Sequence, residues 1–206
     1  MDLQSLFKLI VSNNLGACIR GMYYAVRYGR SSCRTMVFHQ LRITPRYIKL
    51  ERGVRLWKKS RIECVCVGNQ NIKPLLWIRQ NVNIEQNCHI TCGNSIIIGE
   101  RTSITANVTI TDIRHPYEDI ATAVKYQPYT TTPVRIGADC HIANGAVILP
   151  GTVIGNHCVV GANAVVKGCF PDFTIIAGNP AKVIKYYNVT TKRWEKCNVS
   201  NDVHIM

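Results

Sequence analysis

An aliphatic residue returns at every sixth position over much of the second half of the chain. The members of this series are Ile136, Ile142, Ile148, Ile154, Val160 and Val166. A period of six is neither the period of two of an ordinary strand nor the period of about 3.6 of a helix. It is typical of a parallel β-helix, in which each short strand forms one wall of a coil. We therefore expect these side chains to point into the coil.

Four positions after each of these residues comes a residue that is mostly small. This second series consists of Cys140, Ala146, Thr152, Cys158, Ala164 and the larger Phe170. It fits the corner of a coil, where little room remains for a side chain. A thiol at such a position behaves as a compact hydrophobic group, so the ten cysteines do not by themselves indicate disulfides. No signal peptide is visible, which favours a reducing cytoplasm.

The repeat extends towards the N-terminus with changes of phase. Two earlier series keep the spacing, namely Ile78, Ile84, Ile90 and, after a two-residue insertion, Ile98, Ile104, Ile110. Before Ile78 the signal weakens, because Ser60 interrupts a series of three other residues. The three are Val54, Cys66 and Ile72. We predict an all-β solenoid over residues 54–176, preceded by a basic amphipathic helical segment, residues 1–53.

Residues 177–206 follow the solenoid and are predicted to form a short C-terminal helix and a tail. Gly178 and Asn179-Pro180 mark a turn. The apolar spacing from Ala181 to Tyr187 then predicts the helix. Lys182 and Lys185 are three residues apart and would share a helix face, where they could bind phosphates.

The six-residue rhythm stops between Ile110 and Ile136, which predicts an extruded loop over residues 114–133. Loops on rigid scaffolds often carry function. His115 lies at the root of this loop, and an imidazole that titrates near neutral pH suits a general base. Asp112, three residues upstream, leaves two interpretations open: it holds the tautomer of the imidazole, or it caps a turn.

The net charge of +13 belongs mainly to residues 1–61, where thirteen Lys and Arg face only Asp2 and Glu51. Two interpretations remain open: amphipathic helices attach to an anionic membrane surface, or they pack on the solenoid with a solvated charged face. No apolar run approaches the roughly 20 residues of a spanning helix. No recognition motif accompanies the charge, so we expect no nucleic-acid partner.

The repeat, the His115-Pro116 pair and the segment IIAGNPAKVIKYY together resemble the hexapeptide-repeat acyltransferases, which are left-handed parallel β-helices. The similarity covers about residues 72–187. The His-Pro pair is similar to that of maltose and galactoside O-acetyltransferases. The N-terminal region and the tail KYYNVTTKRWEK are more similar to O-acetyltransferases of lipopolysaccharide O-antigen and other surface polysaccharides.

The resemblance implies a homotrimer with active sites between neighbouring subunits and acetyl-CoA as co-substrate. It assigns six residues to the binding of acetyl-CoA: Ala143, Asn144, Ala162, Lys167, Lys182 and Lys185. It assigns four residues to the acceptor: Glu85, Asn87, Tyr117 and His141. Where many sugar enzymes have Trp this chain has His141, and where polysaccharide relatives often have a second His it has Ile113, so the acceptor is less well defined than the cofactor.

Three histidines, His89, His115 and His141, are each 26 residues apart, as a zinc site in a β-helix would allow. The γ-class carbonic anhydrases share this coil, but their two histidines separated by four residues are absent here. We therefore expect no metal.

We expect a cytoplasmic enzyme that transfers acetyl from acetyl-CoA to a sugar hydroxyl of a surface-polysaccharide precursor. Under the membrane interpretation of the basic segment, it acts at the inner face of a bacterial plasma membrane. The acceptor is a sugar or a lipid-linked glycan. No cysteine is placed like a nucleophile, which favours direct attack with His115 as base. Two alternatives remain: acetylation of a small molecule such as a free sugar, an antibiotic or serine, and a non-catalytic trimeric scaffold.

Overall fold

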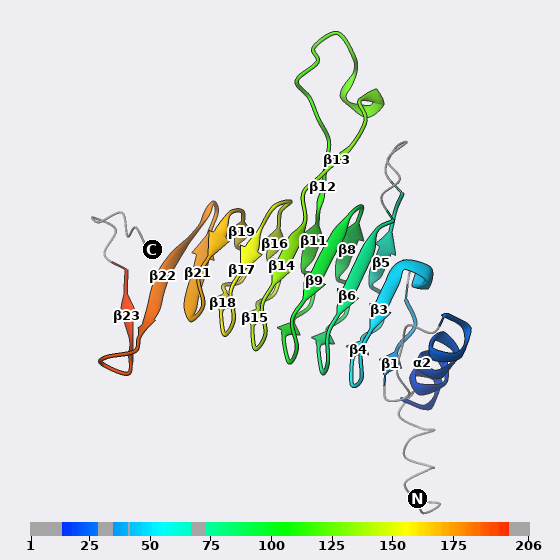
Figure 1. Cartoon of the computed structure of the whole chain (residues 1–206), viewed down its shortest axis with the longest axis horizontal. Helices are drawn as coiled ribbons and strands as arrows, with labels where there is room; N and C mark the ends of the chain where they lie inside the picture. The colour runs from blue at the N-terminus through cyan, green and yellow to red at the C-terminus, as the bar shows by residue number, and fades with distance from the viewer. Residues whose placement is uncertain (1–13, 29–34, 41, 67–72, 198–206) are drawn as a thin grey trace, which may run out of the picture.

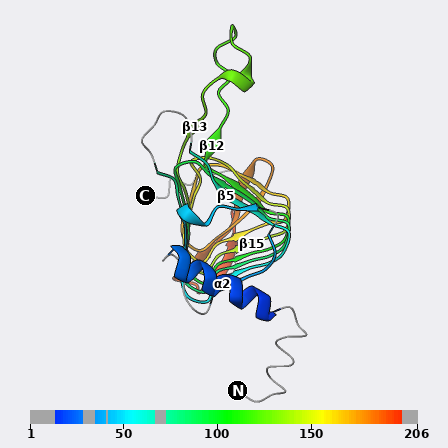
Figure 2. The ribbon, with the colours of Figure 1, turned by 90° about the vertical axis from the view of Figure 1, so that its right-hand side faces the viewer.

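A computed structural model of the chain describes residues 14–28, 35–40, 42–66 and 73–197. Helix α2 (Asn14–Tyr28) lies at the N-terminal end, and most of the other elements wind into one elongated solenoid (Figure 1). Figure 2 looks along the solenoid, whose strands form three sheets that we call walls A, B and C. The corners between them are named by the walls that they join.

The three walls are built from short strands. Wall A contains β1 (Met36–Val37), β4 (Arg55–Leu56), β7 (Asn83–Ile84), β10 (Ser103–Ile104), β15 (His141–Ile142), β18 (Val159–Val160) and β21 (Thr174–Gly178). Wall B contains β2 (Arg42–Ile43), β5 (Arg61–Cys64), β8 (His89–Cys92), β11 (Thr109–Thr111), β16 (Val147–Ile148) and β19 (Val165–Val166). Wall C contains β3 (Ile48–Leu50), β6 (Leu75–Ile78), β9 (Ser95–Ile98), β14 (Val134–Ile136), β17 (Val153–Ile154) and β20 (Cys169–Phe170).

Equivalent strands of successive coils pair in parallel, as β8 does with β5 and β11. The six residues of the aliphatic series from Ile136 to Val166 are at most 1 % exposed, and those of the small series are at most 9 % exposed. The predicted inward rows are therefore confirmed. The nine cysteines among the described residues are free thiols. Burial raises the pKa of the Cys88 thiol to about 11, as expected for a thiol that serves as a hydrophobic side chain.

The solenoid starts at β1, within residues 1–53, for which the sequence predicts helices. Its early coils follow a different phase from the predicted one. The inward row runs through Leu50, Leu56 and Ile62, whereas Val54 and Ser60 occupy the small corner position. Ser60 fits this position because its hydroxyl donates to the carbonyl of Glu85 and accepts from the N–H of Cys88. Residues 1–13 and Ile72 lie outside the described residues.

The predicted C-terminal helix is wrong. Residues 181–188 instead form strand β22 (Ala181–Asn188), which pairs antiparallel with β21, and β23 (Arg193–Lys196) then pairs with β22. The reason is the open edge of β21, whose backbone groups need partners at the end of the wall. Ala181 and Val183 pack against the core from this strand.

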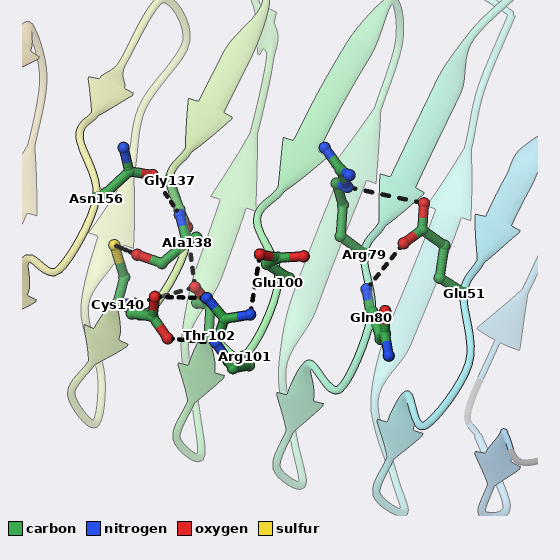
Figure 3. A network of polar contacts seen from close by, with 11 residues as sticks. Glu51, Arg79, Gln80, Glu100, Arg101, Thr102, Gly137, Ala138, Cys140 and Asn156 are labelled. Carbon is green, nitrogen blue, oxygen red and sulfur yellow. Dashed lines mark hydrogen bonds and ion pairs between the residues drawn. The ribbon is translucent and has the colours of Figure 1, made fainter.

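Side chains also link successive coils, as at the corner between walls C and A (Figure 3). Arg101 donates from Nε and Nη2 to both carboxylate oxygens of Asp139, at 2.7 and 2.8 Å, and from Nη1 to Glu100 at 2.9 Å. These bonds raise the pKa of Arg101 and lower the pKa of Asp139. Thr102 donates to the carbonyl of Gly137 in the next coil. The guanidinium of Arg101 is thus shared between two carboxylates.

Helix α2 packs on β1 at the N-terminal end of the solenoid (Figure 1). Arg20 donates from Nε to the carbonyl of Val37 at 2.7 Å. Gly21 permits the close approach, because a Cβ atom there would lie 2.0 Å from the carbonyl oxygen of Thr35. Among the described residues no helix is long and apolar enough to cross a membrane.

The opposite face of α2 carries an exposed apolar stripe. Ile19, Met22, Tyr23 and Val26 are 55, 53, 54 and 88 % exposed. Their spacing of three and four residues places them on one side of the helix. The helix therefore has an amphipathic character whose apolar side does not face the solenoid.

Adjacent residues of β17 allow a matched test of the inward row. Ile154 is 1 % exposed and Val153 is 39 % exposed. Ile154→Ala should lower the free energy of unfolding by about 2–5 kcal/mol, because it leaves a cavity in the core. Val153→Ala should lower it by less than about 1 kcal/mol. Chemical denaturation of both variants measures the difference, and equal losses would contradict the inward assignment.

Candidate active site

A loop leaves the solenoid between walls B and C and projects far from it (Figures 1 and 2). Its stalk is an antiparallel pair, β12 (Ile113–Arg114) and β13 (Thr130–Thr131). Thr132 closes the stalk: its N–H donates to the carbonyl of Asp112, and its own carbonyl accepts from Gly151 of the next coil. Farther out, a short 3-10 helix, η2 (Val124–Tyr126), precedes the buried Gln127, whose amide donates to two loop carbonyls. The loop is therefore tied to the corner at its root and ordered within itself.

The carboxylate of Asp112 is buried at this corner. It accepts hydrogen bonds from three consecutive backbone N–H groups of the preceding coil, those of Gly93, Asn94 and Ser95, at 2.6, 2.8 and 2.8 Å. Among the contacts of the described residues none joins Asp112 to His115. These contacts correspond to the turn-cap interpretation of Asp112, which stabilises the corner from which the loop leaves.

His115 lies exposed at the end of the stalk. Its ring meets the ring of Tyr129, across the stalk, edge to face at a centroid distance of 4.4 Å. Both side chains border a groove of about 390 Å³ whose floor is the outer face of wall B. The floor carries Arg61, Glu63 and His89. A groove of this size suits a ligand of one or two sugar units.

The residues predicted to contact the acceptor do not border this groove within one chain. Glu85 and Asn87 lie at the corner between walls A and B, where the Glu85 carboxylate accepts from the N–H of Ala106 at 3.1 Å. His141 faces outward on wall A, in register with Ser103 and Val159. Tyr117 lies in the loop and is 67 % exposed, with the Arg114 guanidinium 5.3 Å from its ring centroid. The structure therefore does not bring these four together with His115.

The residues predicted to bind acetyl-CoA lie on later coils. Ala143 and Asn144 follow β15 and Ala162 follows β18, so they stack at the corner between walls A and B. Asn163 donates from its backbone N–H to the carbonyl of Asn144 at 2.9 Å. Lys167 is exposed at the corner between walls B and C, after β19. Within one chain none of these borders the His115 groove.

Lys182 and Lys185 lie on strand β22 and not on a helix. Lys182 pairs with Ala177 and Lys185 with Ile175, with a bulge between the two pairs. Lys182 is exposed and Lys185 is half-buried. The predicted common helix face therefore does not exist, although both cations remain at the C-terminal end of the solenoid.

The three evenly spaced histidines do not converge. His89 and His115 border the groove on wall B, whereas His141 lies on wall A. Within the described ranges no three His, Cys, Asp or Glu side chains are close enough to hold a metal ion.

Residues 133–168 match the family model described as bacterial transferase hexapeptide (six repeats). A protein of Escherichia coli named as a lipopolysaccharide biosynthesis O-acetyl transferase is 40 % identical over 131 residues, which cover 60 % of this chain and 67 % of that protein. The chain belongs to the hexapeptide-repeat acetyltransferases. Its fold is accordingly a left-handed parallel β-helix.

Two further relatives belong with it. A protein of Mycobacterium tuberculosis named as an acetyltransferase is 42 % identical over 179 residues, 79 % of this chain, but this chain spans only 57 % of its length. The crystal structure of a hexapeptide-repeat acetyltransferase from Vibrio cholerae, complexed with acetyl-CoA, has a TM-score of 0.52 and 25 % identity. That match covers 66 % of this chain and 72 % of the other.

For this hexapeptide-repeat acetyltransferase, sequence analysis missed Arg61, Glu63 and Tyr129 and gave His89 little weight. For two of these residues, Arg61 and His89, the repeat itself contains the information that could have found them. Arg61 and His89 each directly precede an inward aliphatic residue, so they occupy equivalent outward positions of β5 and β8. A search of outward positions one coil apart would have placed them side by side. Tyr129 has no such signal, because its place depends on how the loop returns.

The contacts of Asp112 predict a stability effect. Asp112→Ala leaves three backbone N–H groups without their acceptor and should lower the free energy of unfolding by about 3 kcal/mol or more. Asp112→Asn retains one acceptor oxygen and should lose less. Asp119→Ala is the control, since this exposed loop carboxylate accepts from the N–H of Ala121. Urea unfolding measures all three, and an unchanged midpoint for Asp112→Ala would refute the capping role.

Proposed function

We propose that the protein transfers acetyl from acetyl-CoA to a sugar hydroxyl of a surface-polysaccharide precursor, with His115 as general base. The observation that carries this proposal is the position of His115 beside a groove large enough for a sugar. The lipopolysaccharide-related name of the Escherichia coli relative supports the acceptor class. The acetyl-CoA complex of the Vibrio cholerae relative supports the donor.

In this proposal the imidazole of His115 removes the proton of the acceptor hydroxyl as its oxygen attacks the thioester carbonyl. The tetrahedral intermediate then collapses, the C–S bond breaks, and the imidazolium returns the proton to the leaving CoA thiolate. A backbone N–H of a coil stabilises the oxyanion. Among the described residues no cysteine or serine borders the groove, which supports direct transfer without an acyl-enzyme.

Asp112 is engaged with the backbone, so we assign the orientation of the imidazole to other groups. The ring of Tyr129 packs against one edge of His115. Pro116 restricts the backbone of His115 to extended conformations. The stalk pair of β12 and β13 fixes the point from which the side chain projects.

We infer that the active enzyme is a homotrimer with each site between two subunits. Ala143, Asn144 and Ala162 lie away from the His115 groove of their own chain, so a site that needs both sets must combine two chains. One subunit would then supply His115, and its neighbour would supply the corner that holds the pantetheine arm. Lys167, Lys182 and Lys185 would bind the far end and the phosphates of CoA. Tyr117, His141, Asn87 and Glu85 remain proposed acceptor contacts.

The base role predicts the effect of His115→Ala. This variant should reduce turnover by about 10²–10⁴-fold, because the acceptor hydroxyl loses its base. The mass of the oligomer should not change. His157→Ala is the control, since His157 is exposed at the corner between walls C and A. Release of CoA thiol in the presence of lipid-linked glycans, nucleotide sugars and free sugars measures the rate and separates the acceptor classes. Equal rates in both variants would exclude His115.

We also propose that the N-terminal end of the solenoid contacts an anionic membrane surface. The apolar stripe of α2 supplies side chains for the interface, and the first two coils supply cations. Exposed ones include Arg46, Lys49, Arg52 and Arg55. This combination is typical of interfacial attachment. In a trimer with parallel solenoids the three stripes would face the same side, which strengthens binding by multivalency.

The stripe can be tested by vesicle flotation. The full chain should float with phosphatidylglycerol vesicles but not with phosphatidylcholine vesicles, and less at high salt. Replacing Ile19, Met22 and Val26 together by Ser should abolish flotation. Replacing Ile120 and Val124, exposed apolar residues of the loop, by Ser is the matched control. Undiminished flotation of the triple variant would refute the contact.

A further inference from the structure

Two rows of outward side chains run across β5, β8 and β11 beneath the groove. Arg61, His89 and Thr109 form the first row, and their Cα atoms pair in register. Glu63, Thr91 and Thr111 form the second row. The rows bring together residues from three coils, and they end beside His115 and Tyr129. Any molecule that brings a hydroxyl to His115 along this floor therefore passes over these side chains.

Among the described residues that border the groove Glu63 is the only acidic one, and its side chain is only 2 % exposed. Two guanidinium groups hold its carboxylate. Arg42 approaches one oxygen with Nε at 2.7 Å, and Arg61 donates to the other from Nε at 2.6 Å. A buried carboxylate needs such partners, because an unpaired buried charge is costly. Glu63 therefore lies as a counter-charge between the two arginines, and its hydrogen bond holds Arg61 in place.

The charges of this group do not balance. One carboxylate faces two guanidinium groups, whose side chains are 61 % exposed for Arg42 and 48 % exposed for Arg61. A guanidinium has five N–H donors in a planar fork, and Glu63 engages only the Nε and Nη2 side of Arg61. Arg61 thus presents a net positive charge and further donors to the groove.

Arg101 provides the contrast within the same solenoid. It also links two coils, but there one guanidinium faces two carboxylates, Asp139 and Glu100 (Figure 3). That arrangement uses all three nitrogens of the arginine and leaves no surplus positive charge. A pair that only holds coils together needs no second arginine. The excess of arginine occurs beside His115, where a ligand would lie.

We propose that Arg61, held in place by Glu63, binds an anionic group of the acceptor, a carboxylate or a phosphate on the sugar. This inference rests on the proposed function, because it gives the acceptor of the same site its chemical class. The planar fork of Arg61 suits the two oxygens of either group. The hydroxyls of Thr91, Thr109 and Thr111 serve the uncharged positions of the sugar, and the ring of Tyr129 offers an apolar face.

The test compares acceptors that carry an anionic group with matched acceptors that lack it. One pair is 4-nitrophenyl glucuronide with its uncharged carboxamide, and the other is glucose 1-phosphate with glucose, each repeated in the galacto series. The full-length protein should have a kcat/KM at least about tenfold higher for the charged member of a pair. Arg61→Gln should lower kcat/KM for charged acceptors by about 10- to 100-fold, mainly through KM, and change it less than about twofold for uncharged ones. Arg101→Gln, the control, should change neither.

Binding of the same compounds, measured by calorimetry without acetyl-CoA, gives a readout independent of catalysis. The charged member of a pair should bind more tightly, and Arg61→Gln should remove the difference. Which pair responds distinguishes a uronate from a sugar phosphate. Should Arg61→Gln fail to fold, Arg61→Lys keeps the charge without the fork and should give an intermediate loss for charged acceptors.

Equal affinity for charged and uncharged members, or equal losses for both in Arg61→Gln, would overturn the inference. Acetyl transfer to uncharged acceptors that depends on His115 would then still support the proposed function. Conversely, selective binding of the charged compounds without any acetyl transfer would support the anion site and refute the proposed reaction.

Discussion

The structure depends on parallel pairing between equivalent residues of successive coils. Because each strand pairs with the strand one coil away, every inward side chain stacks on its counterpart, and the two ends of every corner must lie close together, even where the corner carries the long loop. The buried rows through Ile136 and Cys140 meet both conditions, one by filling the coil and the other by leaving room at its corner. The same pairing aligns outward residues such as Arg61 and His89, so a repeat that builds the core also arranges the surface.

The core could be predicted because its residues obey one period. The phase of the repeat could not be predicted before Ile78. The insertion between β5 and β6 breaks the six-residue spacing between Ile78 and the inward row through Leu50, Leu56 and Ile62, and other apolar residues suggest a different phase. The segment after Gly178 was ambiguous for another reason. Seven residues with mixed apolar spacing fit a short helix or a strand, and the unpaired edge of β21, which decides between them, is a tertiary feature.

The candidate site could be predicted only where the sequence departs from the six-residue period. His115 stands at the interruption, so its prominence follows from the sequence, although its role as a base remains a prediction. Asp112 has the same prominence, but its partners are backbone N–H groups of the preceding coil, which no side-chain pattern records. The arginines around Glu63 keep the period but occupy its outward positions, where no compositional rule applies. Their charge imbalance becomes visible only when the coils are stacked.

The closed root of the loop makes changes within the loop largely independent of the stability of the stacked coils. Thr132 and Asp112 bring the two ends of the loop together at a single corner, and the entropy cost of closing a longer loop grows only slowly with its length. The part of the segment beyond His115 and Tyr129 can therefore be lengthened, shortened or exchanged with little effect on the stacked coils. A lineage could reshape the surroundings of the groove by replacing this outer part while inheriting the rest of the scaffold unchanged.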